Sequence, residues 1–389
     1  SSNGLEKRPK LRFPGFDEPW KETALSSVLT ERNEYAEKDG TYEHATLSKE
    51  GIYGKTARYD RDFLVSTENK KYKVTHLGDL CYNPANLKFG VICLNTYGDA
   101  IFSPIYVTFE IDASSDPDFI GAYLTRWDFI NRALKYQQGT VYERMAVSPE
   151  DFVSIKCCFP QKAEQTRLAE FITLLDNRIA AQGKYVESLK KYKRGLLSAV
   201  FSQNVSMFST ADFYAFSELA VRRSEKYDPK CNAHAACIEL EHIEQETGRI
   251  IGSTCADYQN SIKTVCKPGD VMFGKLRPYL RKYAFVQKEC VCSSEIWSLI
   301  PTDIVIPKYL FYLIQSEAFM KVANVSSGTK MPRAEWSTIA KSGYLIPSKD
   351  DQQATVDILE TTDRIIASHV ASYDRFIEYK KGLLQRLFI

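Results

Sequence analysis

The chain has 389 residues, 44% hydrophobic and 12% aromatic, which excludes a disordered polypeptide and allows two or three domains with cores of their own. Its formal net charge of +2 is far below that of a stand-alone nucleic-acid binder, so any basic surface must be local. None of the ten cysteines forms a Cys-x-x-Cys pair, and we find no secretory leader and no run of about 18 apolar residues. We therefore expect free thiols, a cytoplasmic location and no membrane contact. Residues 1–4 lack an initiator methionine and are interpreted as a remnant of processing.

The first part of the chain mixes strand and helix patterns. Residues 89–95 and 101–111 are apolar runs between turn signals, which predicts strands, and residues 117–134 have the periodicity of a helix. The same order returns later, with strands predicted in 291–301 and a helix in 307–324. The predicted fold class is therefore mixed α/β.

Two long helices are predicted, from Gln165 to Phe201 and from Gln352 to Ile389, and neither contains a proline. In the first, leucines occupy one heptad position and mostly aromatic residues the position three later, which predicts a helix–helix seam. At about 1.5 Å per residue each helix is roughly 55 Å long, so each needs a long partner. The residues expected to pack in the seam are Leu168, Leu175, Leu189, Tyr192, Leu196, Ile358, Ile366, Phe376, Tyr379 and Leu383.

The two helices end in nearly the same hexapeptide, YKRGLL at 192–197 and YKKGLL at 379–384. Two unrelated amphipathic helices would explain the periodicity but not the shared ends, so we infer an internal duplication. We expect Tyr192 and Tyr379 on the seam in matching environments, and Lys193 and Lys380 at solvent or at a partner surface. Further matches, at offsets that drift from 191 to 187 residues, are Gly78 with Gly269, Pro160 with Pro347, Gln165 with Gln352 and Asp176 with Asp363. The predicted domains are two globular parts, 5–160 and 204–348, and two helical parts, 161–203 and 349–389.

Catalytic motifs are missing from the sequence. It contains no Gly-x-x-x-x-Gly-Lys-Ser/Thr loop, so ATP hydrolysis is not expected. Residues 83–86 are the nearest approach to an amino-methyltransferase loop, but they lack its second proline and its aromatic residue. Glu68-Asn69-Lys70 fits part of a nuclease motif without a Pro-Asp partner upstream.

The densest group of potential metal ligands is Cys231, His234, Cys237 and His242. Its spacing differs from the two tight ligand pairs of a zinc ribbon, and cysteine is also a common small buried residue. We expect packed thiols with no metal and no cofactor, and structural zinc is the alternative.

Basic side chains interleaved with aromatic rings are concentrated in residues 271–288, a stretch without carboxylates. Cations beside planar rings suit phosphate contacts and base-edge readout, although a solvated strand edge has the same composition. Polar stretches that contain glycine recur at 137–144 and 326–333, where a ligand could approach the backbone closely. The candidate DNA-binding residues are Lys55, Arg58, Lys70, Lys71, Lys73, Asn83, Lys88, Thr140, Arg144, Lys275, Arg277, Tyr279, Arg281, Lys282, Thr329, Lys330 and Arg333.

In the order of these parts, the chain resembles the specificity subunits of Type I restriction-modification enzymes. The resemblance covers essentially the whole chain, and its motifs are specific through their order rather than one by one. The stretches that carry it are KLRFPGFDEPWKETALSSVL (10–29), GDLCYNP (78–84), GDVMFGKLRPYLRK (269–282), GTKMPRAEW (328–336) and the paired helices.

The resemblance implies two target-recognition domains that each read one half of a split, asymmetric site on double-stranded DNA, and two antiparallel spacer helices that set the gap. It also implies two methylase subunits docked on the assembly and motor-nuclease subunits that complete it, so the chain itself would not be an enzyme. Partner subunits would then neutralise many of the phosphates. Two other hypotheses stay open, which are a self-sufficient DNA methylase or nuclease with an unrecognised site and a coiled-coil adaptor that binds only protein.

Overall fold

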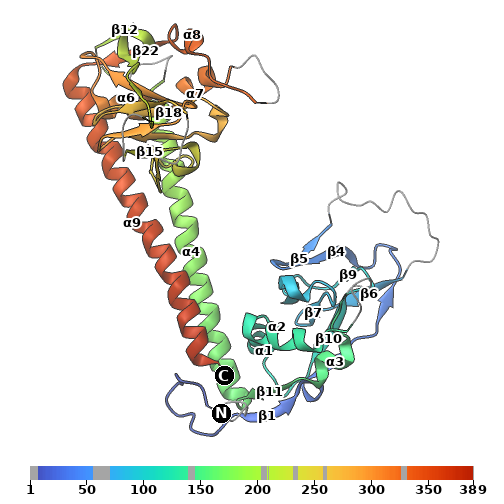
Figure 1. Cartoon of the computed structure of the whole chain (residues 1–389). Helices are drawn as coiled ribbons and strands as arrows, with labels where there is room; N and C mark the ends of the chain where they lie inside the picture. Colours follow the sequence, from blue (N-terminus) through green and yellow to red (C-terminus); the bar gives the residue numbers. More distant parts are fainter. Residues whose placement is uncertain are drawn as a thin grey trace. The chain divides into compact units, whose positions relative to one another are not determined.

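The computed structural model describes residues 8–55, 71–138, 145–202, 208, 210–230, 235–256, 261–325 and 331–388. The chain divides into two compact units. Unit 1 comprises Ser1–Ala181 and Asp374–Ile389, and unit 2 comprises Gln182–Tyr373. Each unit contains one globular part and a portion of each long helix, α4 (Lys162–Val200) and α9 (Lys349–Leu387), drawn in green and red in Figure 1.

Unit 1 builds its globular part from small sheets covered by short helices. The described sheets have the strand orders β1-β11, β2-β10-β7-β8 and β3-β6-β9-β4-β5. The strands are β1 (Lys21–Ala24), β2 (Leu29–Glu31), β3 (Tyr35–Ala36), β4 (Glu43–Ser48), β5 (Gly51–Gly54), β6 (Tyr72–Thr75), β7 (Leu80–Tyr82), β8 (Ile92–Leu94), β9 (Ala100–Phe102), β10 (Val107–Ile111) and β11 (Lys156–Phe159). The helices are η1 (Leu25–Ser27), η3 (Leu87–Phe89), α1 (Pro117–Leu124), α2 (Trp127–Ala133), η4 (Leu134–Tyr136) and α3 (Pro149–Ser154).

Unit 2 has the same kind of architecture. Its described sheets have the strand orders β12-β22, β13-β21-β18-β19 and β14-β17-β20-β15-β16. The strands are β12 (Ala211–Ala215), β13 (Ala220–Arg222), β14 (Lys226–Tyr227), β15 (Ala236–Ile238), β16 (Thr254–Cys255), β17 (Lys263–Cys266), β18 (Val271–Gly274), β19 (Tyr283–Phe285), β20 (Cys290–Cys292), β21 (Ile296–Pro301) and β22 (Gly343–Pro347). The helices are α5 (Phe216–Leu219), η5 (Leu240–His242), η7 (Pro278–Leu280), α6 (Pro307–Leu313), α7 (Glu317–Ala323) and α8 (Trp336–Ile339).

The two units repeat one topology. Every strand neighbour in the orders of unit 1 has its counterpart in unit 2, including the parallel pairs β4–β9 and β15–β20 among antiparallel neighbours. Because unrelated domains do not share eleven strands in one order and direction, the match reflects duplication. The predicted mixed α/β class and the predicted internal repeat are confirmed.

The predicted helices 117–134 and 307–324 are each interrupted. In unit 2 the Ser316 hydroxyl accepts the backbone N–H of Phe319 (3.2 Å) and starts α7 after α6 has ended. In unit 1 the break falls between α1 and α2, where the Thr125 hydroxyl donates to the Gly121 carbonyl (2.8 Å). Hydroxyl side chains that bond the nearby backbone end or start a helix without changing its apolar periodicity, which is why the pattern predicted one helix.

Each long helix is joined to its globular part by a buried glutamine near its first turn. The Gln165 amide donates to the Pro160 carbonyl (2.9 Å) and accepts the backbone N–H of Asp116 (2.9 Å). Gln352 repeats both bonds in unit 2, with Pro347 (3.0 Å) and the N–H of Ile306 (2.8 Å). Because a buried amide must find partners, the repeated Pro-x₄-Gln pattern fixes where each helix leaves its sheet.

Within each unit, α4 and α9 run antiparallel. In unit 2, Gln182 contacts His369 (3.0 Å) and Lys193 contacts Asp363 (2.6 Å), so residue numbers fall along α9 as they rise along α4. In unit 1 the ion pair joins Lys380 to Asp176. The two ion pairs are counterparts in the repeat, because Lys193 and Lys380, like Asp176 and Asp363, are 187 residues apart.

The position of Lys193 differs from the expected solvated one. Its side chain is buried, with 8% of the residue exposed, and its ammonium donates to Gln315 (3.1 Å) and lies over the Tyr312 ring. The Tyr312 hydroxyl in turn donates to Asp363 (2.9 Å). Lys193 therefore connects α4 to α9 and to α6, whereas Lys380 is half-buried and bonded to Asp176.

The seam also differs from the expected one. Leu168 and Leu383 are buried, and Leu175, Leu189, Leu196, Ile366 and Phe376 are half-buried, as expected for packing residues. Tyr192 and Tyr379 instead lie 59% and 61% exposed, and Ile358 is exposed as well. Heptad spacing alternates between three and four residues, and the row that packs beside the leucine row lies four residues after it, at Ile172 after Leu168 and at Val186 after Gln182. The two tyrosines are exposed to a similar extent, on the outside of the helix pair.

Candidate nucleic-acid interface

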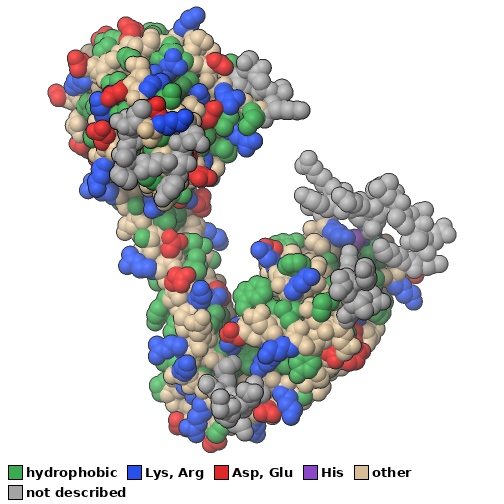
Figure 2. Space-filling view, viewed as in Figure 1, with side chains coloured by type: hydrophobic (Ala, Val, Ile, Leu, Met, Phe, Trp, Pro, Cys, Tyr) green, Lys and Arg blue, Asp and Glu red, His purple; other side chains and the backbone are tan. Residues whose placement is uncertain are grey.

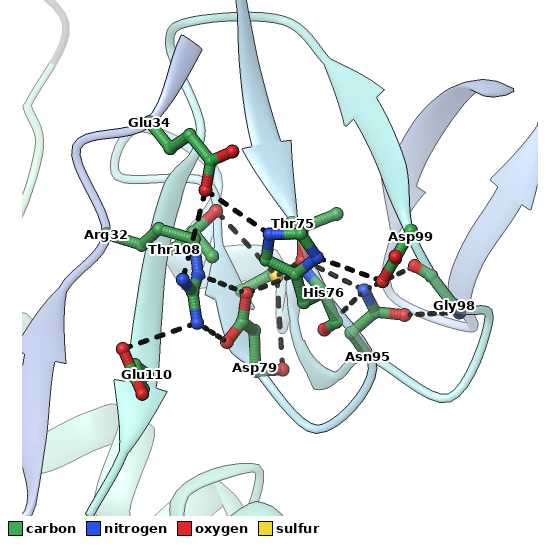
Figure 3. A network of polar contacts seen from close by, with 11 residues as sticks. Arg32, Glu34, Thr75, His76, Asp79, Asn95, Gly98, Asp99, Thr108 and Glu110 are labelled. Carbon is green, nitrogen blue, oxygen red and sulfur yellow. Dashed lines mark hydrogen bonds and ion pairs between the residues drawn. The ribbon is translucent and has the colours of Figure 1, made fainter. Parts of the chain in front are cut away.

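A network of polar side chains fixes the start of β7 in unit 1 (Figure 3). The Arg32 guanidinium makes two bonds to the Asp79 carboxylate (2.9 and 3.0 Å), and Asp79 also accepts the backbone N–H of His76 (2.7 Å). His76 bridges Asp99 (2.9 Å) and Glu34 (3.2 Å). The hydrogen bond to Asp79 outweighs desolvation and raises the pKa of Arg32. The bidentate pair holds the strand that leads into the next loop.

Unit 2 repeats the arginine–aspartate core of this network. Arg223 makes two bonds to Asp270 (both 2.7 Å), and Asp270 accepts the backbone N–H of Lys267 (3.0 Å). Lys267 stands where unit 1 has His76, and its ammonium contacts Glu225 (2.8 Å), the counterpart of Glu34. The arginine–aspartate pair, with the backbone N–H that the aspartate accepts, is called the anchor of each unit. The counterpart strands β7 and β18 therefore begin next to equivalent anchors.

The loop that follows each anchored strand is the same structure in both units. We call residues 83–90 the η3 loop and residues 274–281 the η7 loop. Four backbone hydrogen bonds recur in the two loops. In unit 1 the N–H groups of residues 83, 89, 90 and 147 donate to the carbonyls of residues 91, 86, 87 and 84, respectively. In unit 2 the N–H groups of residues 274, 280, 281 and 334 donate to the carbonyls of residues 282, 277, 278 and 275. The last bond of each set ties the loop to the segment before α3 or α8, so the loop is held on both sides.

Backbone strain in the η7 loop points to a functional role. Arg277 and Arg281 have positive φ angles of 52° and 50°, a conformation that L-residues rarely adopt. In the η3 loop the position of Arg281 is taken by Gly90, with φ of 77°. Such conformations persist where surrounding contacts impose them, and they cluster at binding sites. The N–H of Arg277 bonds the Pro332 carbonyl (2.8 Å), which is one such contact.

The η7 loop presents cations that no carboxylate neutralises. Among the described residues, the Lys275 ammonium and the Arg277 guanidinium make no ion pair, and Tyr279 beside them is 53% exposed. In the η3 loop, Lys88 lies over the exposed ring of Phe89, 5.2 Å from its centroid. Over the rest of the face in Figure 2, Lys and Arg are interspersed with Asp and Glu in both units. The two loops therefore offer local positive charge beside an exposed ring on a chain of low net charge.

Comparison with known proteins bears on this pair of loops. Residues 227–374, which include the η7 loop, match the family described as the Type I restriction modification DNA specificity domain. This stretch of the chain is therefore similar to that specificity domain. A curated relative is the Type I restriction enzyme MjaVIII specificity subunit of Methanocaldococcus jannaschii, 22% identical over 62% of this chain and 63% of the relative. Another is the HindI specificity subunit of Haemophilus influenzae, 30% identical over 35% of this chain and 31% of the relative. The matches thus span less than two thirds of either relative.

Solved structures show the same fold over nearly the whole chain. The S subunit of the Type I restriction-modification system from M. genitalium superposes with a TM-score of 0.55 at 14% identity, over 98% of this chain and 99% of that one. A chain from a study of complex assembly and conformational transition of the type I system superposes with a TM-score of 0.60 at 15% identity, over 96% and 98%. At this identity the likeness is one of fold, and it covers the architecture of both units.

Several predicted DNA-binding residues of this chain have internal roles. Lys73 is buried and bonds Glu31 and Asn33 (3.0 and 2.9 Å). The Asn83 amide oxygen accepts the N–H groups of residues 85 and 86 and shapes the η3 loop, and the Lys282 ammonium donates to the carbonyl of residue 240 (2.6 Å). These three side chains are occupied in holding the loops, so we leave them out of the proposed interface.

Two arginines beside the η7 loop are neutralised by carboxylates. Arg281 bonds Glu317 (2.6 Å), and Arg333 makes two bonds to Glu295 (3.1 and 3.2 Å), which raise the pKa of Arg333. The backbone carbonyl of Glu295 also accepts the N–H of Lys275 (2.9 Å), so Glu295 links the η7 loop to the segment at 331–334. Both arginines position the loop and carry less free charge than Arg277.

The remaining candidates fall into two groups. Lys71 is exposed and Lys55 half-buried, near the ends of residues 56–70. The predicted residues that lie outside the described part of the chain are Arg58, Lys70, Thr140, Arg144, Thr329 and Lys330.

The sequence analysis missed Phe89 and Trp127, which are 60% and 56% exposed in unit 1. An alignment of the two halves at the offset of 191 would have placed Lys88 and Phe89 opposite Tyr279 and Leu280 in the basic stretch of unit 2. That alignment was the available signal, because the residues around Phe89 lack the density of cations found in the second half.

The cysteines and histidines give no metal centre among the residues described. No group of three or more potential ligands comes together there, and Cys231 and His234 lie outside the described residues. Cys237, Cys266, Cys290 and Cys292 are free and buried in unit 2, and burial raises the pKa of the Cys237 thiol to about 11. No helix in the described ranges has the length and apolar composition to cross a membrane.

Proposed function

We propose that this chain is the non-catalytic DNA-recognition subunit of a Type I restriction-modification complex, and that each unit reads one half of a bipartite site. The observation that carries the proposal is the duplicated loop, built on the same anchor in both units and presenting exposed cations beside an exposed ring. Two copies of one reading device suit a target with two separate parts. The names of the curated relatives support the same assignment.

The chemistry of the loops fits base and phosphate contacts. A free guanidinium such as that of Arg277 can bond a guanine edge or a phosphate with two N–H groups, and a lysine ammonium such as that of Lys275 or Lys88 suits phosphates. Arg277 lies on a strained loop and makes no ion pair with a carboxylate among the described residues. Binding energy is therefore available for the nucleic acid.

The complex requires further chains for catalysis. We propose that two methylase subunits dock on the helices, that motor-nuclease subunits complete the assembly in the cytoplasm, and that the helices set the gap between half-sites. The net charge of +2 supports a division of labour in which these partners neutralise many of the phosphates. The proposed recognition domains are residues 5–160 and 204–348.

Domain exchange tests the proposal. Residues 204–348 are replaced by the corresponding part of another specificity subunit, and the complex is expressed with its methylase subunits. Methylome sequencing should show one half-site changed and the other retained. Unchanged methylation targets would contradict the proposal and favour a protein-only adaptor, and methyl transfer by the purified chain alone would favour a self-sufficient enzyme.

A point variant gives the same test without a new domain. Arg277→Gln should relax discrimination in one half-site by roughly 1–3 kcal/mol. Lys288→Gln, an exposed cation of unit 2 outside the η7 loop, is the matched control and should leave the target unchanged.

A further inference from the structure

The contact between the end of the loop and the first residue of α2 in unit 1, or of α7 in unit 2, differs in its chemistry. In unit 2 the Arg281 guanidinium at the exit of the η7 loop bonds Glu317, the first residue of α7 (2.6 Å). In unit 1 the corresponding residues are Gly90 and Trp127, the first residue of α2. A Cβ at Gly90 would meet the Trp127 ring at 3.5 Å, so the indole lies against the bare backbone there. An ion pair in one unit is thus an aromatic contact in the other.

This exchange gives unit 1 an exposed aromatic surface. Trp127 is 56% exposed although its ring covers Gly90, and Phe89 next to Gly90 is 60% exposed. Both side chains project from hydrogen-bonded backbone. In η3 the N–H of Phe89 donates to the carbonyl of Asn86 (2.9 Å), and Trp127 is the first residue of the helix α2. We call Phe89 and Trp127 the aromatic platform. Exposed apolar surface rimmed by polar side chains is typical of interaction sites.

The repeat indicates what covers the platform. The η7 loop at the equivalent place carries Lys275 and Arg277, which make no ion pair within the described part of the chain, and Lys88 lies over Phe89 in the η3 loop. Cations on both loops favour a polyanion over a protein surface. If the η7 loop faces DNA, as the proposed function requires, the η3 loop faces it as well, because both loops are built by the same hydrogen bonds.

We propose that the aromatic platform makes apolar contacts to bases in the half-site read by unit 1. The proposal rests on the proposed function and adds that the two half-sites are read by different chemistry. Rings can contact a thymine methyl or the face of an unstacked base, and neither contact releases counterions. The η7 loop instead uses charged groups that contact base edges and phosphates. The platform should therefore contribute sequence discrimination that is insensitive to salt.

The experiment uses the complex of the full chain with its methylase subunits and a duplex that carries its methylation site. Phe89→Ala should weaken binding to the specific duplex about tenfold, within the range that one lost base-pair contact gives. It should flatten the response to base substitution at one or two neighbouring positions of the unit 1 half-site and at none in the other. The slope of log affinity against log salt should not change.

Two variants complete the design. Lys88→Gln should lower the salt slope by about one and leave the base preference intact, because it removes one phosphate contact. Phe213→Ala, which removes an equally large exposed ring from β12, should change neither. Phe89 is mostly exposed, so its loss should leave folding intact, and thermal unfolding of the complex checks this.

The outcomes separate the two proposals. Retained base preference in Phe89→Ala, in a complex that still recognises both half-sites, overturns the platform and leaves the proposed function standing. Loss of methylase binding with unchanged DNA discrimination overturns it too, and assigns the surface to a protein partner. Absence of sequence preference in the unaltered complex would overturn the proposed function itself.

Discussion

At the scale of single residues, the two anchors differ mainly at His76 and its counterpart Lys267. Both cations face a glutamate, Glu34 or Glu225, beside a bidentate arginine–aspartate pair. Burial alone would lower the pKa of His76, but its hydrogen bonds to Asp99 and Glu34 raise it more, and Arg32 opposes them weakly, so the pKa is raised. Unit 1 has a titratable group where unit 2 has a permanent charge.

This difference predicts a pH dependence confined to unit 1. The imidazolium is bound more tightly in the folded state, so its stabilisation is complete below the unfolded pKa of about 6.5 and is lost as the pH rises through the higher folded pKa. The protection factors of the β6 and β7 amides, which are exchange rates corrected for base-catalysed intrinsic exchange, should therefore fall as the pH rises above about 6.5, by an amount equivalent to under about 1 kcal/mol.

The control for this prediction copies unit 2. His76→Lys keeps a positive charge throughout this pH range. The pH-dependent loss of amide protection in β6 and β7 should therefore disappear in this variant. The amides of β17 and β18, next to Lys267, should show no such dependence in the unaltered chain. Equal pH dependence in both units would contradict the assignment to His76.

At the scale of elements, the repeated hexapeptides join the helices through unequal ion pairs. Lys193 is buried with Asp363, Gln315 and Tyr312 around it, whereas Lys380 and Asp176 are partly exposed. A buried cation that loses its partner stays desolvated, while an exposed one is solvated again. Equivalent positions therefore differ in what they contribute to stability.

We expect Asp363→Asn to lower the free energy of unfolding by about 3 kcal/mol and Asp176→Asn by less than about 1 kcal/mol. Urea unfolding of the isolated chain measures both. The double variant Lys193→Met with Asp363→Leu should recover much of the loss, because it removes the uncompensated charge. Similar costs at the two aspartates would show that burial of Lys193 does not decide the difference.

The elements also show which features the sequence could predict. The two long helices and the repeat followed from spacing alone, because periodicity and duplication are properties of the chain itself. The helices start at Lys162 and Lys349, three residues before the predicted starts at Gln165 and Gln352. The residues of the helix–helix seam were not all predicted correctly. A leucine row can pack beside the row three residues later or the row four residues later, and the aromatic residues favoured the row three later, which is not the buried one. The internal roles of Lys73 and Lys282 depend on Glu31 and on a carbonyl of η5, which only the folded chain brings close.

At the scale of the whole molecule, Tyr192 and Tyr379 mark the outer surface of the helix pair in unit 2 and in unit 1. Their exposures of 59% and 61% match although their surroundings differ in sequence. Two equivalent exposed rings suit two copies of one partner, which fits the proposed pair of methylase subunits.

Charged replacements of these rings test the proposed docking. Tyr192→Glu and Tyr379→Glu should each leave one methylase per chain, and the double variant should leave none, as counted by native mass spectrometry. Tyr136→Glu, at an exposed ring of η4, is the control and should retain both copies. A single variant that releases both methylases, or neither, would show that these two rings are not separate docking points.

The crossed ion pairs have a consequence for how such genes recombine. Each pair takes its lysine from one repeat and its aspartate from the other, Lys193 with Asp363 and Lys380 with Asp176. A foreign half acquired by genetic exchange therefore assembles well only if it brings a lysine and an aspartate at these positions. Four helix residues thus act as a compatibility requirement for shuffling, while the loops beside them remain free to acquire new targets.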